Sequence, residues 1–246
     1  MARRSSACTG AAGESFLDGG GEGAVLSERN DIEAIGAAFG CDQEASGQIL
    51  ARGRMRNYPP RACLVRQGDA PAIAFLLILG RAHALLYAAD GQVVLLHEYR
   101  PGDLFGALGG LGGAAEEADI VAVDAVQAFL LDAAALVALA ERNGAIGLAL
   151  SRLLLKRLRA TSERMYERAA LSAPGRVCAE LLRLARDGEG GAIRPVPVIA
   201  ELALKVGTTR ETASRTVSAL LRRGLLRRED DTLMVVAPAR MEAELV

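Results

Sequence analysis

One stretch of sequence decides the fold: Gly207-Thr208-Thr209-Arg210-Glu211-Thr212-Ala213-Ser214-Arg215. A glycine at this place predicts that one helix stops at Gly207, since glycine readily takes the left-handed conformation that ends helices. The T-x-x-E pattern that follows predicts a capping box. In it, the Thr208 hydroxyl accepts the amide proton of Glu211 and the Glu211 carboxylate reaches back to the start of the helix. Two helices joined by a tight turn are therefore expected here.

The flanking residues predict a winged helix-turn-helix. Residues 199–206 have the spacing of a short helix, and in the next helix Ala213, Val217 and Leu220 recur at i, i+4 and i+7, which gives it one apolar face. A short helix, a glycine turn and a second helix with a buried stripe match the helix-turn-helix plan, whose second helix enters the major groove of DNA. Residues 225–228 and 232–236, separated by an acidic turn, predict the two strands of a wing.

The polar face of the second helix carries groups suited to reading bases. Arginine can donate to guanine, and a glutamate can accept from cytosine N4. We predict base contacts by Arg210, Glu211, Ser214 and Arg215. We predict phosphate contacts by Lys205, Thr209 and Thr212. The alternative is a protein-interaction winged helix, in which Glu211 only caps and the arginines are solvated.

A long helix is expected upstream of this region. Residues 145–169 keep helical apolar spacing over about twice the average helix length. A narrow apolar seam on so long a helix favours a partner helix, and hence a homodimer. The predicted dimerisation residues are Leu150, Leu153, Leu154, Leu158 and Met165. The alternative is a helix that lies across its own β-rich domain.

The middle of the chain changes to short β-rich runs. Strands are predicted over 63–66, 73–79, 81–87, 93–99, 120–123 and 126–131, separated by Gly and Asp turn signals. They predict a small antiparallel barrel or roll, preceded by short helices within 31–54. The expected organisation is a flexible Gly- and Ser-rich tail (1–30), a β-rich sensor domain (31–141), the dimerisation helix (142–171) and the winged helix-turn-helix (172–246).

Composition excludes several classes of protein. The chain has 246 residues, 51% of them hydrophobic, and a net charge of -1, which argues against binding nucleic acid through bulk charge. No run approaches the ~18 apolar residues of a membrane span, and no apolar signal-peptide core follows the N-terminus, so we expect a cytoplasmic protein with no membrane partner. The rival reading, a cupin-like metal enzyme, needs clustered histidines and carboxylates, whereas the two histidines are isolated and the four cysteines have no paired spacing. We expect neither an enzyme nor a metal site.

Several motifs, in order, resemble the cAMP receptor protein/FNR (CRP/FNR) family of bacterial transcription regulators. They are Val65-Arg66-Gln67-Gly68-Asp69, Leu77-Ile78-Leu79-Gly80-Arg81, Pro101-Gly102-Asp103-Leu104-Phe105-Gly106, Arg157-Leu158-Arg159-Ala160-Thr161-Ser162-Glu163-Arg164 and the stretch quoted at the outset. The resemblance implies an α+β fold: an N-terminal cyclic-nucleotide-binding-type β-roll, a long dimerisation helix and a C-terminal winged helix-turn-helix. It implies double-stranded promoter DNA and RNA polymerase as partners, and a TGA core in each half-site.

The chain departs from the family where cAMP would bind. The effector pocket implied by the resemblance comprises Gly106, Ala107, Leu108, Glu117, Ala118, Thr161 and Ser162. cAMP-binding members follow the first glycine with a Glu and place an Arg-Ser pair where Glu117 and Ala118 stand here, so a carboxylate would repel the cyclic phosphate. Thr161 and Ser162 match the adenine-contacting pair, although helix-interface hydroxyls are the favoured interpretation. We therefore expect no control by cAMP.

Other sensing chemistries find less support in the residues. The lone Cys8 cannot hold an iron–sulfur cluster, and we predict no cofactor. Haem held by His83 or His97 is the alternative, although both histidines stand in predicted strands, where a structural role is favoured. A regulator that works without an effector is a further alternative.

Overall fold

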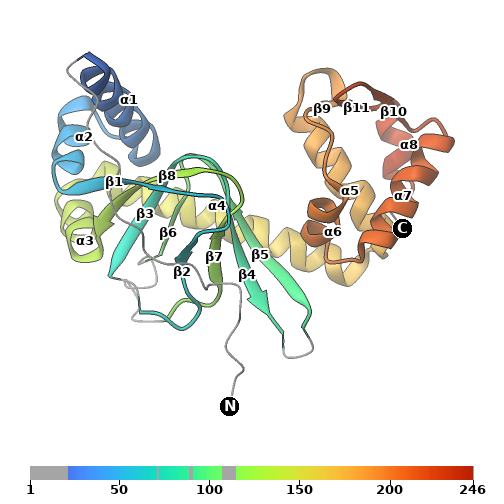
Figure 1. Ribbon diagram of the computed structural model, residues 1–246, viewed down its shortest axis with the longest axis horizontal. Helices are drawn as coiled ribbons and strands as arrows, with labels where there is room; N and C mark the ends of the chain where they lie inside the picture. Colours follow the sequence, from blue (N-terminus) through green and yellow to red (C-terminus); the bar gives the residue numbers. More distant parts are fainter. Residues whose placement is uncertain (1–21, 71, 89–90, 107–114, 246) are drawn as a thin grey trace. The chain divides into compact units, whose positions relative to one another are not determined.

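The computed structural model describes residues 22–70, 72–88, 91–106 and 115–245, and side chains from Asp31 onward. The chain divides into two compact units, Met1–Lys156 and Arg157–Val246, each described by itself below (Figure 1). The division falls inside a long helix, α4 (Gly144–Ala170), which contributes residues to both units.

The N-terminal unit is built from two β-sheets and a group of helices. Its elements are, in order, α1 (Glu22–Phe39), α2 (Gln43–Leu50), β1 (Gly53–Tyr58), β2 (Cys63–Val65), β3 (Ile73–Leu79), β4 (Ala82–Tyr87), β5 (Val93–Tyr99), β6 (Leu104–Gly106), β7 (Asp119–Ala122), β8 (Val126–Asp132), α3 (Ala133–Arg142) and the first part of α4. The described strands form one antiparallel sheet in the order β1-β8-β3-β6 and another in the order β2-β7-β4-β5. This arrangement is the β-roll that the strand pattern predicted.

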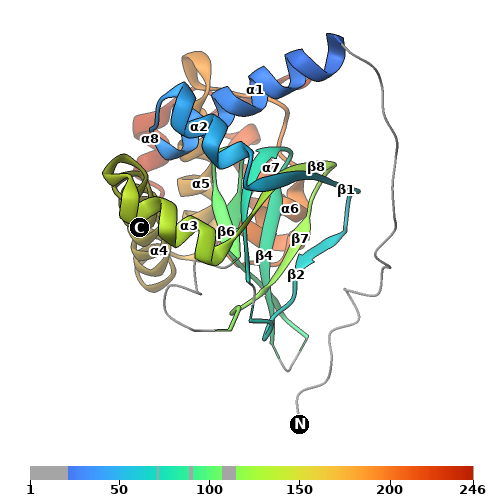
Figure 2. The same cartoon turned by 90° about the vertical axis from the view of Figure 1, so that its left-hand side faces the viewer.

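The sheet β1-β8-β3-β6 is buried on both faces because its strands alternate between two cores. Phe75 and Leu77 of β3 point into the cluster shared with the second sheet. Ala74 and Leu76 point the other way, into a cluster completed by α1, α2, α3 and the start of α4. Figure 2 shows these helices beside β1 and β8. The roll therefore has a sheet-on-sheet core and a helix-on-sheet core.

Two features of this unit correct the expectations from sequence. Helix α1 begins at Glu22, so residues 22–30, expected to belong to the flexible tail, are helical; this stretch lacks proline and is rich in good helix formers. Residues 1–21 lie outside the described residues. Strand β1 lies where the end of a helix was expected, and it pairs with β8 from Gly53↔Leu131 to Tyr58↔Val126. A side chain at Gly53 would overlap the Phe129 ring, so this strand requires a glycine at its start.

The C-terminal unit has the element order of a winged helix. After α4 come α5 (Ala173–Asp187), a short 3-10 helix (Glu189–Gly191), β9 (Ala192–Ile193), α6 (Ile199–Val206), α7 (Arg210–Arg222), β10 (Leu226–Glu229), β11 (Thr232–Val235) and α8 (Pro238–Glu242). The three strands form a sheet in the order β10-β11-β9. Pro174 lies in the first turn of helix α5, where the missing amide costs no hydrogen bond. The two-residue strand β9 is not among the strands predicted from the sequence.

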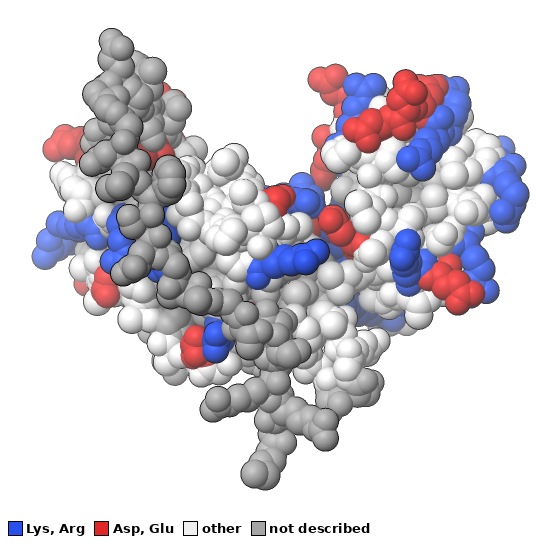
Figure 3. Space-filling model, viewed as in Figure 1, with Lys and Arg blue, Asp and Glu red and all other residues white. Residues whose placement is uncertain are grey.

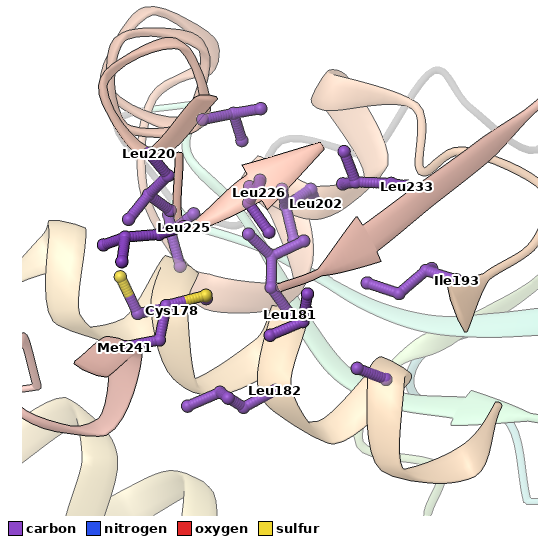
Figure 4. Close-up of a cluster of buried hydrophobic side chains, with 14 of the residues drawn as sticks. Cys178, Leu181, Leu182, Ile193, Leu202, Leu220, Leu225, Leu226, Leu233 and Met241 are labelled. Atoms are coloured by element: carbon purple, nitrogen blue, oxygen red, sulfur yellow. The ribbon is translucent and has the colours of Figure 1, made fainter. Parts of the chain in front are cut away.

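A single apolar cluster holds this unit together (Figure 4). Leu181 of α5, Leu202 of α6 and Leu220 of α7 meet Leu226 and Leu233 of the wing strands, and all are buried. Helices α6 and α7 thus rest on the same core as α5 and the wing, which fixes the two helices relative to each other.

Within the described residues, no single helix combines the length and apolar character needed to cross a membrane. The pair α3 and α4 passes that test only when taken together across a bend of 117°.

Candidate DNA-binding surface and effector site

Helix α7 begins one residue later than the sequence suggested. The N-cap is Thr209, whose Oγ1 accepts the backbone amide of Thr212 at 3.2 Å, and the helix starts at Arg210. The predicted capping box, with Thr208 as the cap and Glu211 as its partner, is therefore wrong. The Thr208 amide instead donates to the Ala203 carbonyl at 3.0 Å, which closes the C-terminal end of α6 around Gly207.

The four predicted base-reading residues all lie exposed on the first two turns of α7. Arg210, Glu211, Ser214 and Arg215 are accessible, whereas Ala213 and Val217 on the opposite face are buried in the core. The N-terminal turns of a recognition helix are the part that reaches base edges. The structure thus presents two guanidinium groups, a carboxylate and a hydroxyl on one free face.

The predicted phosphate-binding residues surround this face. Thr209 is exposed, while Lys205 on α6 and Thr212 on α7 are half-buried. The Thr209 hydroxyl lies 3.0 Å from the Thr212 hydroxyl, so both side chains also take part in capping the helix. A helix N-terminus adds free amide groups and a positive partial charge at this place.

Not every nearby arginine is available to DNA. Figure 3 shows Lys and Arg side chains on the C-terminal unit with acidic side chains among them. Arg223 donates to both carboxylate oxygens of Glu244, at 2.8 and 2.5 Å, and Arg227 lies 2.7 Å from Glu229 on the wing. The pair of Arg223 with Glu244 could not be read from the sequence, because the two residues stand 21 positions apart.

The predicted dimerisation seam divides into a buried and an exposed part. Leu150 is 7% exposed and belongs to the core of the N-terminal unit, and Leu153 is partly buried against the same cluster. For Leu150 the expectation is corrected, because the start of α4 covers its own β-roll. Leu154, Leu158 and Met165 are 44%, 62% and 71% exposed and recur at i, i+4 and i+11, so they form an open apolar row along the helix.

The residues of the implied effector pocket have different surroundings. Gly106 ends β6 with φ 80°, and a Cβ there would come within 2.6 Å of the Ile73 carbonyl oxygen, so glycine is required. Glu117 is exposed, and Ala118, which immediately precedes β7, is buried. Ala107 and Leu108 lie outside the described residues.

The two hydroxyl residues of that pocket lie on the part of α4 that belongs to the C-terminal unit. Thr161 and Ser162 are both exposed, and the Thr161 hydroxyl donates to the Arg157 carbonyl one turn back at 3.0 Å. Such a bond within one helix accounts for the Thr161 donor without any ligand.

The histidines considered as haem ligands are engaged in the β-roll. His83 is buried, with Nε2 3.3 Å from Oε2 of the buried Glu98, and Oε1 of Glu98 accepts from Arg100 Nε at 2.9 Å. The His97 ring packs edge-on against Tyr99, with centroids 4.6 Å apart. Ligation by His83 through Nε2 would break a buried polar contact. Across the residues that the structure describes, no three His, Cys, Asp or Glu side chains are placed to hold a metal ion.

A β-roll, a long helix and a winged helix-turn-helix with an open recognition face define a DNA-binding regulator of two units. Residues 55–143 match the model of the cyclic nucleotide-binding domain, and residues 175–244 match that of the Crp-like helix-turn-helix domain. The chain belongs to the CRP/FNR family and is a DNA-binding transcription regulator, not an enzyme.

Individual relatives cover most of the chain. The "Cyclic AMP receptor protein" of Thermus thermophilus is 32% identical over 195 residues, which is 78% of this chain and 88% of the relative. A "CRP-like cAMP-activated global transcriptional regulator" of Mycobacterium tuberculosis is 27% identical over 215 residues, covering 85% and 96%. Among solved structures, the c-di-GMP responsive global regulator CLP of Xanthomonas campestris has a similar fold, with a TM-score of 0.68 at 22% identity, covering 79% of this chain and 99% of that one.

Proposed function

We propose that the protein acts as a homodimer on a palindromic promoter site, reading bases through Arg210, Glu211, Ser214 and Arg215, and that cAMP does not control it. The observation that carries this proposal is the orientation of α7, whose apolar face is buried and whose N-terminal polar face is open. Arg210 and Arg215 would donate to guanines and Glu211 would accept from a cytosine in a TGA-type core. Lys205, Thr209 and Thr212 would hold the flanking phosphates.

The exposed part of α4 supports the dimer. Leu154, Leu158 and Met165 present an exposed apolar row, and contiguous exposed apolar patches on proteins often mark interaction surfaces. Two copies paired along this row would bury it and would carry two recognition helices. Those helices would then read half-sites about one helical turn apart. RNA polymerase is the proposed partner at the promoter.

The effector is where we expect this chain to differ from its named relatives. The Mycobacterium and Thermus proteins are described as cAMP-activated and as a cyclic AMP receptor, whereas CLP is described as c-di-GMP responsive, so similar folds serve different signals. The exposed Glu117 carboxylate and the buried Ala118 methyl provide no partner for a cyclic phosphate. Residues 107–114 lie outside the described part of the chain, and the described residues of the implied pocket favour loss of cAMP control.

Selection from a random library of double-stranded DNA, with the purified full chain, tests the DNA proposal. We expect a palindrome whose affinity falls steeply with salt, because phosphate contacts release counterions. A protein that selects no sequence would overturn it. The selected site then serves for the effector test: affinity and footprint should be the same with and without cAMP, and tighter binding on addition of cAMP would refute the effector proposal alone.

A further inference from the structure

The geometry points to Arg176 as the residue that positions the helix-turn-helix for specific DNA binding. This side chain of α5 donates through Nε to the Val206 carbonyl at 2.8 Å and through Nη2 to the Gly207 carbonyl at 3.2 Å. Its Nη1 donates to the Leu171 carbonyl at 2.9 Å. One guanidinium thus joins the turn of the helix-turn-helix to the junction between α4 and α5. The inference rests on the proposed function.

The acceptors of Arg176 are carbonyls at the ends of segments. Val206 is the last residue of α6, and Gly207 is its left-handed C-cap, with φ 64°. The last carbonyls of a helix have no partner within the helix and carry its negative partial charge, so a cation is favoured there. Leu171 lies between α4 and α5, in the short stretch that links them. The planar fork of arginine can meet three such acceptors at once, which the single ammonium of lysine does poorly.

A second contact links the same two places. Arg168, in the last turn of α4, lies against Gly207: a Cβ built on this glycine would be 3.5 Å from Arg168 Nη2. The Arg168 side chain at the end of α4 therefore lies close to the turn that Arg176 also holds. Helix α7 starts at Arg210, three residues after Gly207. The turn near Arg176 and Arg168 therefore determines the direction of α7 and the position of its base-reading residues.

Arg183 offers a matched control, since it is also an arginine of α5 that bonds to α4. Its guanidinium pairs with Glu167 of α4 and with Glu180 of its own helix. None of its described contacts reaches the turn between α6 and α7. Replacing Arg183 loosens α5 from α4 while leaving the carbonyls of Val206 and Gly207 occupied.

The test compares Arg176→Met, Arg176→Lys and Arg183→Met in the full chain. Specific affinity is measured by fluorescence anisotropy on the selected site, non-specific affinity on a scrambled duplex, and stability by thermal unfolding. For Arg176→Met we expect at least a tenfold loss of specific affinity, with non-specific affinity and its salt slope unchanged, because the phosphate-binding charges remain. Arg176→Lys should recover part of the loss, and Arg183→Met should lower the melting temperature without changing the ratio of specific to non-specific affinity.

Two outcomes would overturn the inference. If non-specific affinity falls with specific affinity and the salt slope drops by about one, Arg176 binds a phosphate itself. If Arg183→Met loses as much specificity as Arg176→Met, general loosening of α5 explains the effect.

Hydrogen exchange separates this inference from the proposed function. Exchange at the Thr208 amide should become faster in Arg176→Met and stay unchanged in Arg183→Met. This measurement needs no DNA, and unchanged exchange in both variants would refute the positioning role even if no DNA site were found. If Arg176→Met does not fold, the same comparison with Arg176→Lys decides.

Discussion

Arg215 Nη2 lies 3.3 Å from Glu211 Oε1, one helical turn apart on the open face of α7. Both side chains are largely exposed, 71% and 76%, so water screens the pair and its contribution to folding is small. The pair does orient the carboxylate and the guanidinium side by side. A G·C pair in the major groove could accept this arrangement with little rearrangement of either side chain.

The first prediction concerns Glu211→Ala. We expect discrimination at one G·C pair of each half-site to fall by about 1–3 kcal/mol, because the acceptor for cytosine N4 is lost. Competition binding against all substitutions of the selected half-site measures the change. Ser218→Ala, an exposed change farther along α7, should leave the pattern of preference as it is. An unchanged preference in Glu211→Ala would contradict the assignment of this face to the groove.

The second prediction separates the two neighbouring threonines. Thr209→Ala should destabilise the folded protein by about 1 kcal/mol, since it removes the hydroxyl that accepts the Thr212 amide at the start of α7. Thr208→Ala should cost clearly less, because it is the backbone amide of Thr208 that bonds to α6. Urea unfolding of the two variants makes the comparison, and the opposite order would restore Thr208 as the cap.

The third prediction concerns the exposed apolar row of α4. Leu158→Glu should convert the dimer to a monomer, because two carboxylates would have to be buried face to face. Sedimentation velocity reports the change. Arg152→Glu, an exposed change on another side of the same helix, should leave the dimer intact. A Leu158→Glu protein that remains dimeric would place the interface elsewhere.

The fourth prediction concerns Glu244. The hydrogen bond from Arg223 holds the pKa of the Glu244 carboxyl below its ordinary value. A carboxyl whose pKa is lowered by folding stabilises the protein above its unfolded pKa, and that contribution is lost as the pH falls through the lowered folded value. NMR titration of the side-chain carboxyl should show a return toward the ordinary pKa in Arg223→Met. The effect should shrink in high salt because the pair is partly exposed. An identical titration in both proteins would show that Arg223 does not act on Glu244.

Helices and strands with a clear periodicity of apolar residues were predictable from the sequence. Strands that form only by backbone pairing with a neighbouring strand were not. The apolar spacing of α6 and the Gly207 stop placed that helix correctly at Ile199–Val206, and the runs of β3 and β5 were found at their observed bounds. Strand β1 has the sequence Gly-Arg-Met-Arg-Asn-Tyr, with no apolar run. It forms because its backbone pairs with the edge of β8. Strand β9 has two residues, too few for any periodicity.

The exposed side chains of the candidate site could be predicted from the sequence, but the helix cap and the packing that hold them in place could not. Exposed polar residues on α7 follow from the stripe of Ala213, Val217 and Leu220, since the opposite face must then be free. Which of two adjacent threonines caps the helix depends on backbone angles that a T-x-x-E pattern does not fix. The burial of Leu150 depends on how the β-roll packs on α4, which helical spacing alone cannot distinguish from a dimer seam.

The three partners of Arg176 are all backbone carbonyls, and this has an evolutionary consequence. Every amino acid supplies the same oxygen, so the contacts of Arg176 do not depend on which side chains stand at positions 171 and 206, although packing in the core still constrains Val206. No pair of positions needs to change together. An analysis of covarying positions among homologues would therefore not detect the three hydrogen bonds of Arg176. A structure or a direct substitution is needed to reveal them.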